Sequence, residues 1–444
     1  MSADLKTPAQ QNQGPSLETV DLTDPAVMEC PYAAYALLRE QAPIHRTANG
    51  KFVVTKYADV ERGLADHKNF SRDTSGYHDP TRTYQDFWKN PKAREIFQKE
   101  GWDRCWPHGN VINSDPPFHT KYRKLMNPMF TQARVEQAGP FIRGLVNELI
   151  DSFIDEGEIE FVERFAVPLP MQMICGLLGF PREDLEQLKA WSMDMAQSLS
   201  GLNSLDEEVR LARSMVAFQH YIVGQLEEKR RHPKDDIISH LAQVPLVPEE
   251  RKDEGYTLSD LISLTFSMHI GGNESTTNSL TSALWLACTH PEAMAEMHED
   301  PSLIPKFIEE SLRLETPFQT FTRAVRGDVE FCGVQLRKND KLDLRLGAAN
   351  RDSTKFDDPD ILDLHRPSPA HHLAFSIGVH HCLGANLARF EMLIAFQELF
   401  GRLKNIRLVP GKNDFTHIPH LMFRGFKTLH IAFDKPPSAP ASPR

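Results

Sequence analysis

The sequence lacks the features that would tie the chain to a membrane or export it. It has no uninterrupted run of about 18 uncharged apolar residues, the length that a membrane-spanning helix needs, so we expect no membrane anchor. Its first segment, MSADLKTPAQQNQGPSLETV, has neither the basic region nor the apolar region of a signal peptide. These absences predict a cytoplasmic protein.

An excess of positive charge is also missing. The 50 lysine and arginine residues are outnumbered by 61 aspartate and glutamate residues, which gives a formal net charge of -11. An acidic chain is repelled by a phosphate backbone, so we expect no nucleic-acid partner. The composition, 40% hydrophobic and 25% charged over 444 residues, is that of a globular protein.

Paired cysteines are the third absence. The six cysteines show none of the short repeated spacings of a disulfide framework or a zinc ribbon, which fits a reducing cytoplasm. They are Cys30, Cys105, Cys175, Cys288, Cys332 and Cys382. A free cysteine usually behaves as a small buried hydrophobe, and we assign that role to all of them except Cys382.

Helical periodicity dominates what is present. Three segments have apolar residues at helical spacing, and a fourth is apolar or small on every side, which places it inside a large protein. The segments are 141–157, 183–199, 214–231 and 257–290. Strand patterns are fewer: residues 51–57, a hairpin over 328–342 with its turn at Lys338-Asn339-Asp340, and residues 426–433. We expect a mainly α fold with small β-sheets, as one domain over 21–434 between disordered segments at 1–20 and 435–444.

The surroundings of Cys382 differ from those of the other cysteines. Its context is FSIGVHHCLG, residues 375–384, in which Gly378 and Gly384 allow the backbone to run close to a flat ligand. The amphipathic pattern NLARFEMLIAFQELFGRL follows directly. A cysteine at a helix N-terminus feels the positive end of the helix dipole, which favours the thiolate. A thiolate is the ligand that pushes electron density from the protein toward O–O cleavage at a haem iron.

These ten residues resemble the haem-binding loop of the cytochrome P450 family, which has Phe, Gly, a basic residue, Cys and Gly at fixed positions. The resemblance implies that Cys382 is the axial ligand of the iron in haem b (iron protoporphyrin IX) and that Phe375 packs against its sulfur. It counts Gly384 among the cofactor-binding residues, and it gives His380 the place of the basic residue that pairs with a haem propionate. There are two alternatives to this role of His380. The histidines of the loop are solvated, or neighbouring histidines form a separate metal site.

Further segments resemble the family in the same order along the chain. Asp115-Pro-Pro-Phe-His119-Thr-Lys-Tyr-Arg123 matches the family's Asp-Pro-Pro-x-His-x-x-x-Arg segment. His119 and Arg123 are four residues apart, so both can point from one helix face at the same anionic group, such as a propionate. By the same resemblance, Arg323 also reaches a propionate.

Glu310 and Arg313 lie three residues apart, on one helix face. They resemble the Glu-x-x-Arg pair of the family, which is buried and holds the segment behind the cysteine loop in place. That role is structural. The alternative is a solvated surface pair that contributes little to stability.

The long apolar segment contains IGGNESTT, residues 270–277. Two adjacent glycines cost a helix roughly 1 kcal/mol each relative to alanine, and buried polar groups are costly unless they are satisfied. Such local departures indicate a functional site, although a kinked core helix with its polar groups bonded to carbonyls is the alternative. The resemblance places the haem between this central helix and the cysteine loop and makes Glu274 and Ser275 the pair that delivers protons. Ser275 stands where threonine is usual, so its rotamer is less restricted.

The resemblance implies a monooxygenase that inserts one oxygen atom from O2 into an apolar or amphipathic small molecule, by hydroxylation or oxidative demethylation. The chain ends soon after the haem region, so we expect electrons from a separate ferredoxin or flavodoxin with its NAD(P)H-dependent reductase. Two alternatives stay open: a peroxide-using or nitrogen-oxide-converting enzyme of the same fold, and a non-enzymatic haem-thiolate sensor or carrier. The pair of Glu274 and Ser275 argues against both.

The resemblance also assigns a mostly apolar substrate pocket with aromatic residues and two hydrogen-bonding groups. Its residues are Ile112, Ser267, Ile270, Gly271, Phe318, Gln319, Phe321 and Phe423. The TPFQTF stretch resembles that of bacterial members that oxidise small aromatics, which favours an aromatic or terpenoid substrate. Lys121, Lys124 and Arg389 are the predicted basic docking face for the redox partner.

Overall fold

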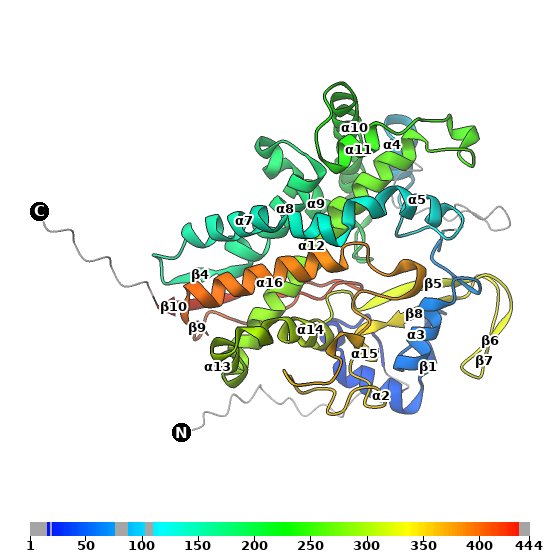
Figure 1. Ribbon diagram of the computed structural model, residues 1–444. Coiled ribbons are helices and arrows are strands. Elements are labelled where there is room, and N and C mark those ends of the chain that lie inside the picture. The colour runs from blue at the N-terminus through cyan, green and yellow to red at the C-terminus, as the bar shows by residue number, and fades with distance from the viewer. Residues whose placement is uncertain (1–15, 18–19, 76–87, 103–109, 435–444) are drawn as a thin grey trace, which may run out of the picture.

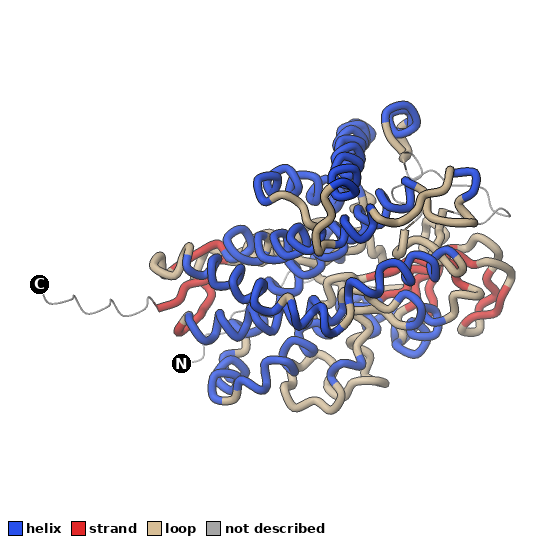
Figure 2. Tube along the Cα trace, turned by 45° about the horizontal axis from the view of Figure 1, so that its top comes forward, coloured by secondary structure: helices blue, strands red, loops and turns tan. Residues whose placement is uncertain are grey.

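The computed structural model describes residues 16–17, 20–75, 88–102 and 110–434 (Figure 1). Helices fill the middle of the molecule and strands gather at its two ends (Figure 2), so the predicted mainly α fold with small sheets is confirmed. Cys105 and most of the segments predicted as disordered lie outside the described residues. Leu17 and Val20 pack, partly buried, against the cluster that contains Leu22 and Tyr35.

The longest helix, α12 (Leu258–Thr289), runs through the centre of the molecule (Figure 1). It begins with a capping box, in which Thr257 and Asp260 each accept a hydrogen bond from the other's backbone N–H. The N-terminal half of α12 packs into one hydrophobic core and its C-terminal half into another. Between these halves, residues 271–279 are small or polar, and several of them are buried and bond to neighbouring elements, as Thr277 does to the Ala166 carbonyl oxygen.

The other helices surround α12 in two groups. One core joins α12 to α7 (Gly139–Asp151), α8 (Pro168–Leu178), α14 (Ile304–Leu314) and α16 (Ala385–Arg402). The other joins it to α4 (Pro91–Glu100), α5 (Phe118–Met126), α9 (Leu185–Ser198), α10 (Leu205–Arg231) and α11 (Ile237–Ala242). Shorter helices complete the fold: α1 (Pro25–Glu29), α2 (Tyr32–Gln41), α3 (Tyr57–Ala65), α6 (Gln132–Gln137), α13 (Pro291–Glu299) and α15 (Leu346–Ala349).

The predicted helices over 141–157, 183–199 and 257–290 correspond to α7, α9 and α12. In contrast, α10 starts at Leu205 rather than at residue 214, because Ser204 and Glu207 form a capping box there. Within the described part of the chain, none of the helices has the length and hydrophobicity to cross a bilayer.

Two sheets occupy opposite ends of the molecule. The larger has the order β1-β2-β8-β5-β3, with β2 and β8 parallel and the other neighbours antiparallel. Its strands are β1 (Ile44–Arg46), β2 (Phe52–Val54), β3 (Phe70–Ser71), β5 (Thr320–Val325) and β8 (Lys341–Arg345). At the other end, β4 (Glu158–Glu160), β10 (His430–Asp434) and β9 (Lys404–Leu408) form an antiparallel sheet. The strands predicted at 51–57 and 426–433 correspond to β2 and β10.

The hairpin predicted over 328–342 has its turn at a different place. β6 (Val329–Phe331) pairs with β7 (Val334–Leu336), so the turn residues are Cys332 and Gly333. Their φ angles are 54° and 75°, the left-handed values that a two-residue hairpin turn of this kind requires. The predicted turn at residues 338–340 instead connects β7 to β8, which belongs to the larger sheet.

Candidate active site

The loop that carries Cys382 is held by its own backbone. The Cys382 N–H donates to the Phe375 carbonyl oxygen at 2.8 Å. Gly378 has a φ of 67°, and a Cβ atom there would lie 3.4 Å from the Cα atom of Ala65 on α3. Glycine takes this conformation without strain, so both the fold of the loop and its packing on α3 favour glycine at this position. The loop leads into α16, which begins at Ala385.

The Cys382 side chain is accessible to solvent, although protein surrounds the sulfur on most sides. Burial raises the pKa of this thiol, whereas the Gly384 N–H and the guanidinium groups of Arg123 and Arg389 act to lower it. The amide and the two cations favour a negative sulfur, and a coordinated metal ion deprotonates a thiol outright. Burial has the larger effect on the pKa, so Cys382 would become a thiolate on binding a metal ion, and the amide and the two cations would then stabilise its charge.

Charged neighbours contact the ring of Phe375, the first residue of the loop. The Arg389 guanidinium lies over this ring, 4.3 Å from its centroid, and donates to both oxygens of Glu309 on α14 at 2.6 and 2.9 Å. His372 contacts the same carboxylate at 3.2 Å. Side chains on either side of the loop, His372 before it and Arg389 on α16, thereby bond to Glu309 on α14.

Buried donors gather on the other side of the loop. Arg323 on β5, His119 on α5 and the side chain of His380 are all less than a tenth exposed. The rings of His119 and His380 lie 4.4 Å apart, and neither Nε2 atom has a hydrogen-bond partner among the described residues. Burial lowers the pKa of His119 to about 3 and that of His380 to about 4, so both rings are neutral at pH 7. Neutral ring nitrogens and a buried guanidinium form a set of donors that matches an anion.

Asp115 is the acid of this cluster. Its carboxylate accepts hydrogen bonds from Ser71 Oγ at 2.5 Å, the Arg72 N–H at 2.9 Å and Arg326 Nη2 at 2.7 Å. His380 Nε2 lies 3.9 Å away, beyond hydrogen-bond distance. Burial alone would raise the pKa of Asp115, but the surrounding donors hold it well below its usual range. Asp115 is therefore ionised and already fully engaged.

Arg123 contacts the cysteine loop. Its Nη1 donates to the His381 carbonyl oxygen at 3.0 Å, and the side chain lines a surface recess beside Cys382. Arg123 helps to lower the pKa of His119, so the two side chains are neighbours. That they share one anionic partner, as their spacing of four residues suggested, stays a prediction.

The segment of α12 with adjacent glycines is helical throughout. A Cβ atom at Gly271 would meet nothing within 4 Å, so this face of the helix borders open space. Ser275 Oγ donates to the Gly271 carbonyl oxygen at 2.9 Å, which agrees for this residue with the alternative of polar groups bonded to helix carbonyls. For Glu274, burial raises the pKa to about 7, with no contribution from any charged group among the described residues. A carboxyl that titrates near neutral pH, adjacent to a hydroxyl, can hold and pass a proton.

Three aromatic residues of the predicted pocket meet in one cluster. The ring centroid of Phe318 lies 4.5 Å from that of Phe423 and 5.2 Å from that of Phe321. Ile112 and Ile270 belong to the hydrophobic core around α5, α9 and the N-terminal half of α12. The aromatic cluster thus joins β5 to the C-terminal part of the chain.

Two of the predicted pocket residues are engaged elsewhere. Ser267 has no exposed surface, and its hydroxyl donates to the carbonyl oxygen three residues earlier at 2.8 Å. Gln319 is 5% exposed, donates to the Thr316 carbonyl oxygen at 2.7 Å and accepts from the Tyr35 hydroxyl at 3.2 Å. The polar groups of both residues are thus already bonded within the protein, and their place in the pocket stays a prediction.

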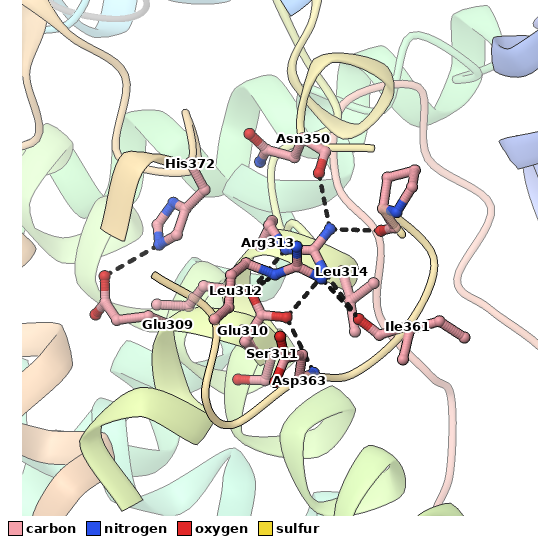
Figure 3. Close-up of polar contacts among 12 residues, drawn as sticks. Glu309, Glu310, Ser311, Leu312, Arg313, Leu314, Asn350, Ile361, Asp363 and His372 are labelled. Atoms are coloured by element: carbon pink, nitrogen blue, oxygen red, sulfur yellow. Dashed lines mark hydrogen bonds and ion pairs between the residues drawn. The ribbon is translucent and has the colours of Figure 1, made fainter. Parts of the chain in front are cut away.

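Glu310 and Arg313 form a fully buried ion pair on α14 (Figure 3). Two hydrogen bonds of 2.7 and 2.9 Å join the side chains, and Arg313 also donates to the carbonyl oxygens of Asn350 and Ile361. Arg366 adds a third cationic contact to Glu310 at 3.0 Å. The pair therefore fastens residues 350–366, the segment that leads into the cysteine loop, and the alternative of a solvated surface pair is wrong.

The predicted docking face is only partly available. Lys121 Nζ donates to Asp260 at 2.9 Å and to two carbonyl oxygens, and Arg389 is paired with Glu309. Lys124 is exposed. Lys121 and Arg389 are therefore each paired with an acidic residue distant in sequence, and the docking role of the three residues stays a prediction.

Two buried charged residues near the site escaped the sequence analysis. Arg72 follows β3 directly and is 8% exposed. Glu391 on α16 is 3% exposed, its Oε1 has no hydrogen-bond partner among the described residues, and burial raises its pKa to about 8. Arg72 gave no signal, because the residues before it, His67-Lys68-Asn69-Phe70-Ser71, are mostly polar. Glu391 gave none, since an amphipathic helix normally carries polar residues.

Comparison with known proteins identifies the family. The family model "Cytochrome P450" matches residues 190–413. The 6-deoxyerythronolide B hydroxylase of Saccharopolyspora erythraea is 31% identical over 406 residues, which cover 91% of this chain and 96% of that protein. The chain belongs to the cytochrome P450 family. The biotin biosynthesis cytochrome P450 of Bacillus subtilis is 30% identical over 91% of this chain and 96% of its own length. The solved structure of cytochrome P450 CYP109Q5 from Chondromyces apiculatus aligns with a TM-score of 0.79 and 32% identity, over 94% of this chain and 98% of that one.

Membership makes this P450 a haem-dependent monooxygenase whose cofactor is haem b, held by a cysteine thiolate. The described residues fit that cofactor. Cys382 offers the thiol, the buried donors of Arg323, His119 and His380 match carboxylates, and Gly271 leaves space beside α12. Among the described residues, no group of three or more His, Cys, Asp or Glu side chains is arranged to hold a different metal ion.

Proposed function

We propose that Cys382 is the thiolate ligand of haem b and that His119, Arg323 and His380 donate to its propionates. The observation that carries this assignment is the contact between the rings of His380 and His119. His380 lies two residues before Cys382, and His119 lies on α5. Both rings are neutral, with buried Nε2 atoms available to an acceptor. Such buried donors are costly unless a ligand satisfies them.

When bound, haem b supplies the iron at which dioxygen is activated with external electrons. The chain's own residues manage substrate, space and protons. We propose that Gly271 leaves room beside α12, that Glu274 holds a proton near neutral pH, and that this proton passes through Ser275 Oγ. One oxygen atom enters a C–H bond of the substrate and the other leaves as water, with two electrons and two protons consumed.

The substrate that we propose is a small apolar molecule, aromatic or terpenoid. The cluster of Phe318, Phe321 and Phe423 supports this class, because stacked or tilted rings favour flat or compact apolar partners. With Ser267 and Gln319 bonded inside the protein, the pocket offers fewer polar groups than the sequence suggested. Relatives carry names as different as pentalenic acid synthase and vitamin D(3) 25-hydroxylase, so the pocket residues carry this proposal.

Electrons come, in this proposal, from a ferredoxin or flavodoxin that docks over the recess beside Cys382, with an NAD(P)H-dependent reductase. The recess is lined by Arg123, Asn127, Phe130, His381, Cys382, Leu383, Ala385 and Asn386. Exposed Lys124 on α5 adds positive charge for an acidic partner. The described cysteines are all free, which supports the reducing cytoplasm as the compartment.

The test is oxygen incorporation by the haem-loaded chain. Ligands that shift the Soret band are first selected from aromatic and terpenoid compounds, and product is then measured with isotopically labelled O2, a ferredoxin or flavodoxin, its reductase and NADH. We expect labelled product only when the partner is present. Equal product from hydrogen peroxide alone would identify a peroxide-using enzyme. Spectral binding without product under either condition would favour a haem-thiolate sensor or carrier.

A further inference from the structure

Arg72 is a buried cation that no motif of the sequence accounts for. It lies directly after β3 and is 8% exposed. Its backbone N–H donates to Asp115, and its guanidinium lies 5.3 Å from the ring centroid of Phe321. The side chain therefore points into the same region as the buried donors of β5 and the cysteine loop, although it comes from a different strand.

The guanidinium of Arg72 is poorly satisfied by the protein. It has five N–H donors, and the bond that they make among the described residues goes from Nη1 to the Thr322 carbonyl oxygen at 3.3 Å. Arg323 has the same deficiency, with one bond of 3.3 Å to the same oxygen. Burial lowers the pKa of Arg72 to about 10 and that of Arg323 to about 9. Two neighbouring buried cations of this kind are costly unless an anion compensates them.

The cations of this cluster outnumber its ion pairs among the described residues. Asp115 forms a salt bridge with Arg326 at 2.7 Å. Its charge also acts on Arg72 and Arg323, but neither of these guanidinium groups forms a salt bridge with a carboxylate in the described part of the chain. The propionates of haem b would supply carboxylate partners for both arginines.

The cluster converges on one place from three parts of the chain. Arg72 and Arg323 both donate to the Thr322 carbonyl oxygen, at 3.3 Å each. The Arg72 N–H donates to Asp115 Oδ1 at 2.9 Å, and His380 Nε2 lies 3.9 Å from the same oxygen. Arg72 thus faces the same region as the residues already assigned to the propionates.

We propose that Arg72 is a further cofactor-positioning residue, which donates charge-assisted hydrogen bonds to a propionate of haem b beside Arg323. The inference rests on the proposed function, because it takes the propionates to lie at His119, Arg323 and His380. The competing role is recognition of a carboxylate on the substrate, since Arg72 also lies over Phe321 of the aromatic cluster. The two roles predict different measurements.

The test compares Arg72→Gln and Arg72→Lys with the wild-type holoenzyme. Arg72→Gln should transfer haem to apomyoglobin at least about tenfold faster, because a hydrogen bond to a charged group stabilises by more than one tenfold step in equilibrium. Its reduction potential should fall, since a nearby cation favours the reduced iron. Arg72→Lys should keep the potential near the wild-type value while still losing haem faster, because lysine keeps the charge without the bidentate fork.

Arg62→Gln is the matched control. Arg62 also lies over a phenylalanine, 4.4 Å from the ring centroid of Phe331, but it lies on α3 and is not one of the cations of the cluster. It should leave both haem loss and potential unchanged. If Arg72→Gln leaves both unchanged and only weakens the binding of carboxylate ligands, Arg72 recognises substrate and the proposal is overturned. If it weakens folding without changing the potential, its role is structural and the proposal is again overturned.

Arg323→Gln separates failure of this inference from failure of the proposed function. Faster haem loss in Arg323→Gln with no change in Arg72→Gln would overturn the role of Arg72 alone. No change in either variant would mean that the propionates lie elsewhere, which overturns both. Should Arg72→Gln yield too little holoenzyme, Arg72→Lys still decides, since a propionate contact predicts faster haem loss at an unchanged potential.

Discussion

The hydroxyl of Ser275 donates to the carbonyl oxygen of Gly271, 2.9 Å away and one turn earlier on α12. This bond holds the hydroxyl against the face of the helix that borders open space at Gly271. A serine hydroxyl that donates in this way can still accept a hydrogen bond. The adjacent carboxyl of Glu274 titrates near neutral pH. The hydroxyl of Ser275 is therefore restrained without the methyl group of threonine, and its role in proton transfer stays a prediction.

Removing the Ser275 hydroxyl should separate electron consumption from product formation. We expect Ser275→Ala to bind substrate normally, to form less product per NADH consumed and to release more hydrogen peroxide. Ser275→Thr should preserve or improve the yield, because the extra methyl group restricts the rotamer. Ser279→Ala is the control: its buried hydroxyl makes the equivalent bond one turn later, at 2.8 Å to the Ser275 carbonyl oxygen. Unchanged coupling in Ser275→Ala would identify Ser275 as a bystander.

Replacement of Cys382 tests the iron ligand. A thiolate ligand gives the red-shifted Soret band of the ferrous carbon monoxide complex, so Cys382→His should retain haem but lose that band. Cys288→Ser and Cys332→Ser are the controls, because these free cysteines lie on α12 and in the β6–β7 turn. Both control proteins should keep the band. The assignment fails if the band survives in Cys382→His or disappears in either control.

Breaking the buried pair on α14 should prevent folding. Glu310→Ala leaves Arg313 charged and fully buried, at a cost of about 3–5 kcal/mol, so we expect little folded, haem-loaded protein. Glu228→Ala is the matched control, since Glu228 and Arg231 are also three residues apart. Arg231 Nη2 lies 3.3 Å from Glu228 Oε2, and the two side chains are 67% and 52% exposed. Glu228→Ala should lower the free energy of unfolding by less than about 1 kcal/mol. The measurements are yield and haem content per chain, and normal values for Glu310→Ala would refute the expectation.

The sequence predicted the elements whose signal is local. The periodicity of α7, α9 and α12 is contained within each segment, because a helix buries one face or all of its surface regardless of which partner covers it. The loop around Cys382 was equally readable, since its glycines and histidines lie within ten residues. The hairpin turn was misplaced because Cys332 resembles a strand residue, and only its pairing with Gly333 at positive φ reveals the turn.

What the sequence could not predict depends on contacts distant along the chain. Gln319 was assigned to the pocket, yet the hydroxyl of Tyr35 on α2 donates to its side chain. Lys121 was assigned to a docking face, yet it bonds to Asp260 at the start of α12. Neither partner is indicated by local pattern, because the fold alone brings these segments together. For the same reason the burial of Arg72 beside Arg323 became visible only in the folded structure.

The pH dependence of stability should reveal the buried carboxyl of Glu391. Burial raises its pKa in the folded protein to about 8, so the folded state holds a proton that the unfolded state releases at a lower pH. Its contribution to the unfolding free energy is therefore fully present below the unfolded pKa and is lost as pH rises toward about 8. Glu391→Gln should flatten this decline in thermal unfolding experiments. An equal decline in both proteins would show that another group causes it.

The pH dependence of coupling should report on Glu274. Burial raises its pKa to about 7, so the carboxyl is protonated below that pH and ionised above it. If it supplies the proton that Ser275 passes on, product per NADH should fall as pH rises through about 7. Glu274→Gln should couple poorly at every pH and show no such step, because an amide does not exchange a proton in this range.

The controls are two further variants. Glu274→Asp should keep a step in product per NADH, and Ser279→Ala should follow the wild type. Reduction by the partner is measured separately at each pH, so that slower electron transfer is not mistaken for lost coupling. A step that persists in Glu274→Gln would assign the titration to a different group.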